Sequence, residues 1–213
     1  MEKLDYKKEY KDLYLPKTSP MLIDVPEMTF LTVEGEGNPN TSKAYQEALE
    51  LLYGLSFTIK MSKLGKQPIP GYFEYVVPPL EGLWQKKDSP FDGSDWKDKN
   101  MLCWVSMIRQ PEFVTPKVFE WAKQALAAKK PGLNPEKAKL IRWKEGLCCQ
   151  VMHIGPYDEE PATIEKMAAF LEEKGLAVDF NEERKHHEIY LSDPRRTKPE
   201  RLKTVIRHPV IRK

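Results

Sequence analysis

The sequence lacks the features that mark membrane-spanning, secreted and nucleic-acid-binding proteins. Nowhere do about 20 apolar residues run together, as a membrane span requires, and the first residues are charged where a secretory signal would be apolar. The 34 basic and 32 acidic residues give a net charge of only +2, so no overall field attracts nucleic acid. We therefore expect a cytoplasmic protein without membrane contact and without direct nucleic-acid binding.

Cysteines and histidines are few, and their spacing does not match common metal sites. The three cysteines are Cys103, Cys148 and Cys149. They lie in apolar stretches, as reduced core thiols would. The four histidines are His153, His186, His187 and His208. No two of them have HxxxH spacing, so we expect no metal site.

Motifs for nucleotide binding and for a serine nucleophile are missing as well. The stretch Gly35-Glu36-Gly37 begins like a dinucleotide-binding loop but lacks the third glycine and the βαβ pattern that follows it. No serine lies in a G-x-S-x-G elbow. The sequence therefore indicates neither a dinucleotide site nor a serine nucleophile.

What the chain does have is ample material for a core, and an order of elements that occurs twice. Hydrophobic residues make up 40% of the sequence and aromatic residues 10%. Thr41 or Ser42 can cap one amphipathic helix, and a second begins near Pro161. The periodicity predicts strands at 28–35, 72–77, 101–108, 147–154, 188–191 and 202–208.

These elements predict an α+β domain over residues 21–213 that follows an N-terminal extension, residues 1–20. Two pseudo-symmetric strand-helix-strand-strand halves, at about 21–112 and 146–213, are joined by a connector helix at about 116–130. We expect an antiparallel sheet with the helices on one side and a central ligand pocket.

The strand at 188–191 carries a carboxylate among aromatic and apolar residues. Because side chains alternate along a strand, Glu188 and Tyr190 share one face, whereas His187 and Ile189 share the other. If the first face lines a cavity, desolvation raises the pKa of Glu188 and the Tyr190 phenol can donate a hydrogen bond. The alternative is an edge strand with Glu188 in water.

A shared spacing suggests which residues of the two halves correspond. Phe73-x-Tyr75-x3-Pro79 matches Glu188-x-Tyr190-x3-Pro194. In this alignment Tyr75 is the counterpart of Tyr190, and Phe73 faces the cavity where the other half places Glu188.

Further aromatic residues could complete the wall of such a cavity. Trp104 lies on the predicted strand at 101–108, Trp84 lies just before the polar loop at 85–100, and Trp143 lies just before the second half. A core position is the alternative for each of them. His153 can line the pocket or serve as a hydrogen-bonded structural histidine before the Gly155 turn.

Two groups of motifs resemble a known family. His153-Ile154-Gly155-Pro156-Tyr157, followed by a helix and then by residues 188–194 (EIYLSDP), is similar to the GyrI-like small-molecule-binding domain, which is also the drug-sensing part of BmrR-type regulators. The N-terminal half, with residues 12–17 (DLYLPK), 25–28 (VPEM) and 35–39 (GEGNP), is similar to stand-alone GyrI-like proteins that hydrolyse cyclopropane-containing DNA-alkylating compounds. The chain has no helix-turn-helix ahead of this module, so we expect no transcription-factor role.

The resemblance implies a reaction and roles for the residues above. In this family a strand glutamate lies at the pocket floor, and that position corresponds to Glu188. We expect Glu188 to orient or deprotonate the water that opens the strained cyclopropane ring, and Tyr190 or Tyr75 to stabilise charge on the carbonyl oxygen of the substrate. Because ring strain drives such a reaction, the resemblance implies that no metal or organic cofactor is required. The expected substrate-binding residues are Tyr72, Phe73, Trp104, Trp84, Trp143 and His153.

Two other functions remain open at this point. The protein could sequester planar or cationic compounds without turnover, through Glu188 and the aromatic wall. It could also contact gyrase, as the inhibitory member of the family does. The expected partners are otherwise flat aromatic or electrophilic small molecules.

Overall fold

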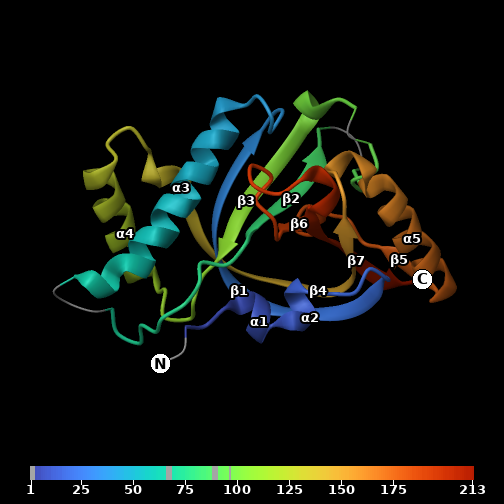
Figure 1. Cartoon of the computed structure of the whole chain (residues 1–213), viewed down its shortest axis with the longest axis horizontal. Helices are drawn as coiled ribbons and strands as arrows, with labels where there is room; N and C mark the ends of the chain where they lie inside the picture. Colours follow the sequence, from blue (N-terminus) through green and yellow to red (C-terminus); the bar gives the residue numbers. More distant parts are fainter. Residues whose placement is uncertain (1–2, 66–68, 88–90, 96) are drawn as a thin grey trace.

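The computed structural model describes residues 3–65, 69–87, 91–95 and 97–213 (Figure 1). These residues form five α-helices and seven strands. The N-terminal half contains α1 (Tyr6–Glu9), α2 (Lys11–Tyr14), β1 (Met21–Glu36), α3 (Lys43–Lys60), β2 (Leu80–Lys86) and β3 (Leu102–Arg109). The remainder contains α4 (Pro116–Lys129), β4 (Lys139–Ile154), α5 (Glu160–Glu173), β5 (Leu176–Val178), β6 (His186–Tyr190) and β7 (Lys203–Arg212).

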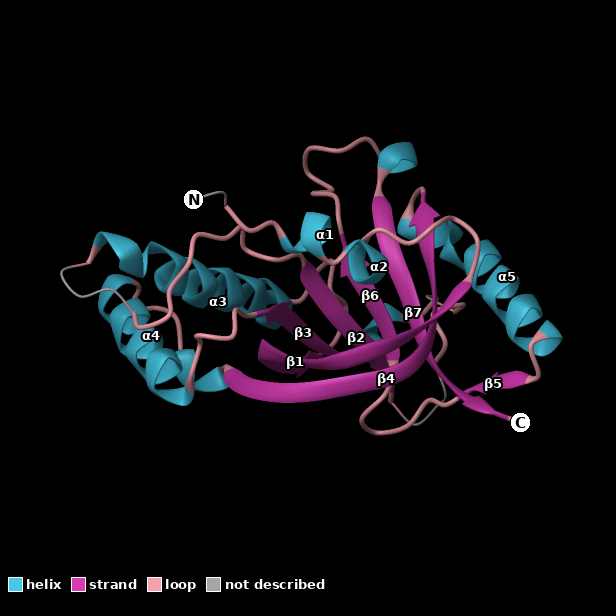
Figure 2. Ribbon diagram, turned by 90° about the horizontal axis from the view of Figure 1, so that it is seen from below, coloured by secondary structure: helices cyan, strands magenta, loops and turns pink. Residues whose placement is uncertain are grey.

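The strands form an antiparallel sheet that closes on itself. Their order is β4-β1-β3-β2-β6-β7-β5, and β4 also pairs with β7, so that six strands complete a ring. Helices α3 and α5 pack against the outside of this barrel-like sheet, and α4 packs on α3 (Figures 1 and 2). The α+β class and the antiparallel sheet are confirmed, whereas the closure was not anticipated.

Most predicted elements exist, with shifted ends. The connector helix is α4, and Ser42 Oγ accepts the backbone N–H of Tyr45 to cap α3, at 3.3 Å. Strands β1 and β4 are longer than predicted because their first halves pair with each other. The predicted strand at 72–77 is wrong: this segment makes a single bridge, between Tyr75 and Leu4.

The two halves repeat the same hydrogen bonds. In the first half, the Gly37 N–H after β1 donates to the Leu102 carbonyl at 2.8 Å; in the second, the Gly155 N–H after β4 donates to the Leu202 carbonyl at 3.0 Å. Both glycines have positive φ, 98° and 141°, a region that side chains disfavour. The strand-helix-strand-strand order is therefore repeated as β1-α3-β2-β3 and β4-α5-β6-β7.

This repeat fixes which residues correspond. Trp104, two residues after Leu102, pairs with Trp84 of β2. In the second half Thr204, two residues after Leu202, pairs with Tyr190 of β6. Tyr190 therefore corresponds to Trp84.

By the same register Glu188 corresponds to Gly82, which is also its direct partner across β2 and β6. The alignment of Glu188 with Phe73, and of Tyr190 with Tyr75, is wrong. A match of a few residues carries no pairing information, and the segment around Phe73 is irregular backbone.

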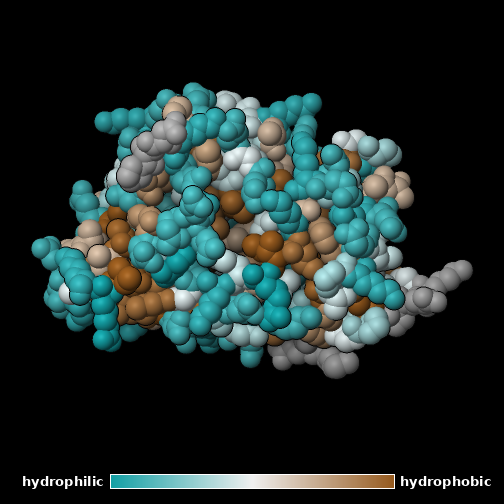
Figure 3. Space-filling model, turned by 180° about the vertical axis from the view of Figure 1, so that it is seen from behind, coloured by the Kyte–Doolittle hydropathy of each residue, from teal (hydrophilic) through white to brown (hydrophobic). Residues whose placement is uncertain are grey.

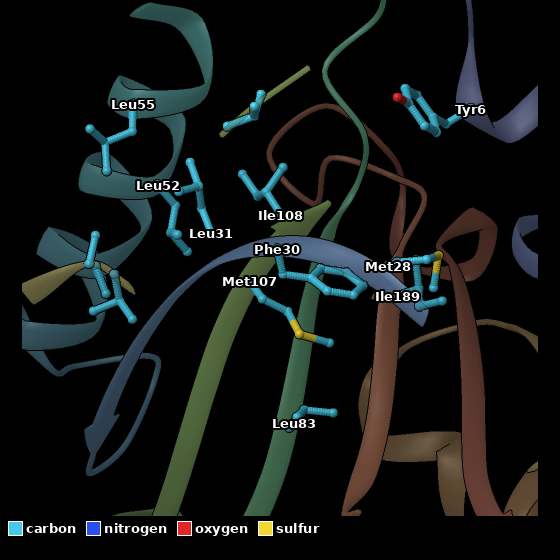
Figure 4. Close-up of a cluster of buried hydrophobic side chains, with 14 of the residues drawn as sticks. Tyr6, Met28, Phe30, Leu31, Leu52, Leu55, Leu83, Met107, Ile108 and Ile189 are labelled. Carbon is cyan, nitrogen blue, oxygen red and sulfur yellow. The ribbon is translucent and has the colours of Figure 1, made fainter. Parts of the chain in front are cut away.

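The core has an apolar part on both sides of the sheet. Figure 4 shows Leu52 and Leu55 of α3 beside Leu31 and Ile108, while Phe30, Met107 and Leu83 lie among the strands. Figure 3 shows the back of the molecule, where hydrophilic residues predominate and hydrophobic atoms gather in smaller areas. In the described part of the chain, no helix combines the length and the apolarity that crossing a membrane requires.

The barrel interior also contains a buried ionic network. Arg207 Nη1 donates to Glu145 Oε2 at 3.1 Å, and His187 lies between Glu145 and Glu81, with its ring nitrogens 3.0 Å from each carboxylate. Arg207 Nη2 donates to the Leu13 carbonyl at 2.8 Å. The network thus attaches the N-terminal segment to the inside of the sheet.

Candidate functional site

Glu188 lies on the outer face of β6, between β2 and β7. Its side chain is 2% exposed, so the solvent-exposed edge-strand alternative is wrong. Across the strand pair, Gly82 leaves room for two aromatic groups: a Cβ there would come within 2.7 Å of Trp84 Nε1 and 3.2 Å of Tyr190 Oη. A glycine opposite Glu188 is therefore what allows these rings to meet beside the carboxylate.

Tyr190 connects the aromatic wall to the carboxylate. Trp84 Nε1 donates a hydrogen bond to Tyr190 Oη at 2.9 Å. The Tyr190 hydroxyl in turn donates to Glu188. Burial and the Glu188 charge raise the pKa of Tyr190 well above its ordinary value, so the phenol keeps its proton.

Two histidines continue the chain on the other side of Glu188. His186 Nε2 lies 2.9 Å from Glu188 Oε1, and His186 Nδ1 lies 2.8 Å from His208 Nε2. Burial, together with the neighbouring His186, lowers the pKa of His208 well below its ordinary value. A neutral His208 accepts from His186 Nδ1 while its other nitrogen bonds the backbone of Asp92.

A second buried carboxyl group, Glu160, lies in the first turn of α5. It is completely buried, and one of its oxygens lies within 4.8 Å of ligand atoms of both His186 and Glu188. Burial and the Glu188 charge raise the pKa of Glu160 well above its ordinary value. Burial acts on Glu188 in the same direction, but hydrogen bonds from His186 and Tyr190 outweigh it and lower the pKa of Glu188.

The pair therefore differs in protonation: Glu160 retains a proton where Glu188 is ionised. Neither Glu160 nor His186 was singled out as a site residue from the sequence. Their contribution depends on how α5 and β7 pack against β6, and no local spacing encodes that. Glu160, His186 and Glu188 are also the described residues that could together hold a metal ion.

Four aromatic residues besides Tyr190 surround this carboxyl pair. Tyr45 of α3 has its ring 4.9 Å from that of Trp104 and 5.9 Å from that of Trp84. Trp104 lies flat over Gly35, where a Cβ would come within 2.3 Å of the indole. The Tyr157 ring is 6.0 Å from the Tyr190 ring. The structure thus brings together Trp84, Trp104 and Tyr190, and it adds Tyr45 and Tyr157.

Three other predicted site residues lie elsewhere. Tyr72, Phe73 and Tyr75 surround Phe113, with ring centroids 5.3, 5.4 and 6.0 Å from it. This cluster is at the C-terminal end of α3, because the Tyr72 hydroxyl donates to the Lys60 carbonyl at 2.8 Å. The Glu188 site is at the other end of that helix, beside its first turn.

Trp143 and His153 have local partners of their own. Trp143 lies in the barrel interior, 5.9 Å from the His187 ring. His153 contacts Thr163 Oγ1 at 2.9 Å and the Pro156 carbonyl at 3.0 Å, which fixes the start of α5. These contacts are those of a hydrogen-bonded structural histidine beside the Gly155 turn, the alternative to a pocket residue.

Two cavities on the described surface are lined by residues other than Glu188. A cavity of about 380 Å³ is lined by Arg109, Arg142 and the start of α4. A second, of about 280 Å³, lies at the end of the barrel near Leu83 and includes Trp104 and Gly35. The aromatic side chains close over Glu188, so ligand entry would require them to move.

Comparison with known proteins identifies the family. Residues 18–211 match the GyrI-like small molecule binding domain. A Listeria innocua structure described as an uncharacterized conserved protein is 49% identical, covering 98% of this chain and 100% of that one, with a TM-score of 0.93. A hydrolase from the same organism is 47% identical, with coverage of 98% and 100% and a TM-score of 0.89.

A more distant structure shares the fold alone. The EcmrR C-terminal domain is 15% identical, covers 92% of this chain and 98% of its own, and has a TM-score of 0.53. No curated protein matches the chain. The matched domain spans nearly the whole sequence, and the chain belongs to the GyrI-like small-molecule-binding domain family.

Proposed function

We propose that the protein is a cytoplasmic hydrolase that opens strained, electrophilic cyclopropane-type compounds by adding water. The observation that carries the proposal is the buried, ionised Glu188 beside a carboxyl group that retains its proton, under an aromatic wall. The 47% identical Listeria innocua protein described as a hydrolase adds support over the full chain. A candidate base, a candidate proton donor and a stacking surface that lie together support the proposal.

The reaction begins with water beside Glu188. The carboxylate takes a proton from the water, whose oxygen forms a bond to the cyclopropane methylene carbon. The ring C–C bond breaks, and its electron pair moves through the conjugated dienone to the carbonyl oxygen, which becomes a phenolate. General acid–base help of this kind contributes about 100- to 10,000-fold.

The phenolate then needs a proton or a hydrogen bond. Tyr190 is the better donor of the two predicted tyrosines, because it already contacts Glu188 and Tyr75 lies in the Phe113 cluster. Glu160 can supply a proton, and the buried Trp104 Nε1–H has no hydrogen-bond partner among the described residues. Each of these groups can stabilise negative charge on the product oxygen.

Substrate binding is assigned to Tyr45, Trp84, Trp104 and Tyr157. Flat ligands gain affinity from stacking on such rings. Because these side chains close over Glu188, we infer that a ligand enters by displacing one of them, with Tyr157 the most exposed to movement since it lies in the short turn before α5. The proposal does not assign substrate contact to the other predicted binding residues, which are Phe73, Tyr72, Trp143 and His153.

The test is incubation of the protein with a cyclopropane–dienone compound in excess, following the water adduct by mass. We expect many product molecules per protein, and a fall of at least about 100-fold in Glu188→Gln, which keeps size but removes the base. Tyr190→Phe should slow turnover, whereas the matched variant Tyr75→Phe should not. Conversion that stops at one ligand per protein contradicts hydrolysis.

That stoichiometric outcome would favour a second candidate function, sequestration of planar cations. It is supported by the ionised Glu188 beneath aromatic rings, an arrangement that attracts cationic ligands. In that case Glu188→Gln should lose affinity for a cationic dye and keep its affinity for a neutral dye of similar shape.

A further inference from the structure

Three acceptor groups converge beside β6 from two separate elements. Glu160 comes from the start of α5, whereas His186 and Glu188 come from β6. One ligand atom of each lies within 4.8 Å of the others, and the three residues are at most 2% exposed. Such a set of two carboxylates and one imidazole is the kind of cluster that binds divalent cations.

Glu160 is the unexplained member of this group. Both of its carboxylate oxygens are buried without a hydrogen-bond partner among the described residues. A buried carboxylate without donors must be neutralised, either by a proton or by a cation. In the metal-free chain that group is the proton that Glu160 retains beside Glu188, and a cation that displaces this proton can take its place.

His186 has the orientation of a metal-binding histidine. His208 accepts from His186 Nδ1 at 2.8 Å and is itself held by the backbone of Asp92. This directs His186 Nε2 to Glu188 Oε1, 2.9 Å away. Metal-ligating histidines are fixed in this way, by a second group bound to the other ring nitrogen.

We propose that Glu160, His186 and Glu188 form a binding site for one divalent transition-metal ion, for which Zn²⁺ is the best match. Zn²⁺ accepts imidazole nitrogen and carboxylate oxygen, and three protein ligands leave a fourth position for water. Bonds of about 2 Å place tetrahedral ligand atoms roughly 3.4 Å apart, so a small rotation of the unpartnered Glu160 carboxylate completes the set.

The inference goes beyond the proposed hydrolysis and does not rest on it. A bound ion occupies the Glu188 carboxylate, which the proposed reaction uses as its base. Metal binding and water activation by Glu188 therefore exclude each other. Zn²⁺ is accordingly an inhibitor of turnover, and its binding can be measured without a substrate.

The test is calorimetric titration of the full, chelator-treated chain with ZnCl₂. The matched control for Glu160→Gln is Glu159→Gln, because Glu159 is the exposed neighbour in the same turn. We expect one Zn²⁺ per chain in the wild type and in Glu159→Gln, and affinity lower by at least about 10-fold in Glu160→Gln. Titration with Co²⁺ should give visible absorption in the wild type that is absent from Glu160→Gln.

Equal Zn²⁺ affinity in the wild type and Glu160→Gln overturns the proposal, as does equal weakening by Glu159→Gln. Circular dichroism checks that each variant folds, and Glu188→Gln carries the test if Glu160→Gln does not. Turnover by the metal-free wild type is measured separately. Its absence contradicts the proposed hydrolysis and leaves the metal result unchanged.

Discussion

Residues 187 and 188 are neighbours in β6 but lie in two opposite electrostatic environments. Inside the barrel, His187 contacts Glu81 and Glu145, and Arg207 donates to Glu145. Outside it, Glu188 lies near a second carboxyl group, Glu160, that has no donor. The interior network balances its charges, whereas the outer site has more acceptors than donors.

The difference separates a structural cluster from a candidate functional one. The interior charges use their hydrogen-bonding capacity on the fold, since Arg207 also bonds Gln150 and the carbonyl of Leu13. The outer carboxyl groups keep unused capacity, and so they can bind a ligand, a proton or a cation. Breaking the first cluster should cost stability, and breaking the second should cost activity.

The largest effect is expected from Arg207→Met. Removing the guanidinium leaves Glu145 buried with too few donors, and breaking one side of a buried ion pair costs about 3–5 kcal/mol. The free energy of unfolding in urea should fall by that amount. Arg142→Met is the control: it loses a pair with Glu27, but its side chain is 75% exposed, so we expect a change of at most about 1 kcal/mol. Equal losses of stability in Arg207→Met and Arg142→Met would show that the interior network contributes no more than a surface ion pair.

The interior network should also make stability fall in acid. Burial acts to raise the pKa of Glu145, but His187 and Arg207 outweigh it and lower that pKa from 4.5 to about 2. Between these pH values the carboxyl group of the unfolded chain binds a proton and that of the folded chain does not, so the free energy of unfolding decreases as the pH falls. We expect a loss of about 3 kcal/mol between pH 4.5 and 2. Urea titrations at several pH values in wild type and Glu145→Gln measure it; the variant should lack this component.

Glu188→Gln should show the reverse balance between activity and stability. Turnover should fall at least about 100-fold, which corresponds to roughly 2.7 kcal/mol of transition-state stabilisation. Stability should change by less than about 1 kcal/mol, because the glutamine keeps the size of the side chain and one oxygen acceptor for His186, and it removes a buried charge. A paired measurement of turnover and urea midpoint tests this. Strong destabilisation with little loss of turnover would make Glu188 a structural residue.

The smallest effect is expected at Gly35, beneath Trp104. A Cβ there would lie 2.3 Å from the indole, so Gly35→Ala must displace the ring. Overpacking of this kind costs about 1–3 kcal/mol. Dye binding should weaken as the Trp104 surface shifts. Gly132→Ala is the control, since a Cβ at Gly132 meets nothing within 4 Å. An unchanged melting temperature and dye affinity in Gly35→Ala would show that Trp104 moves freely.

Part of the site could be predicted from the sequence because alternation along a strand is local. It placed Glu188 and Tyr190 on one face, and Trp84 and Trp104 do lie beside them. Strand pairing and helix packing are not local. The contribution of Glu160 therefore required the position of α5.

The same limit explains the incorrect internal alignment. The spacing of Phe73 and Tyr75 resembled that of the β6 residues, but only the register of β2 against β3 could show that Trp84 corresponds to Tyr190. The closure of the sheet through β4 and β7 could not be predicted from the sequence for a similar reason. Each strand is compatible with an open sheet until both of its neighbours are known.

The repeat places a carboxylate at the position of Glu188 in only one of the two halves. Gly82 and Glu188 are symmetry counterparts that face each other directly across β2 and β6. A perfectly symmetric ancestor with glutamate at both positions would have placed two like charges opposite each other, which is destabilising. One with glycine at both would have had no base. The proposed chemistry therefore depends on the two halves differing at this one residue pair.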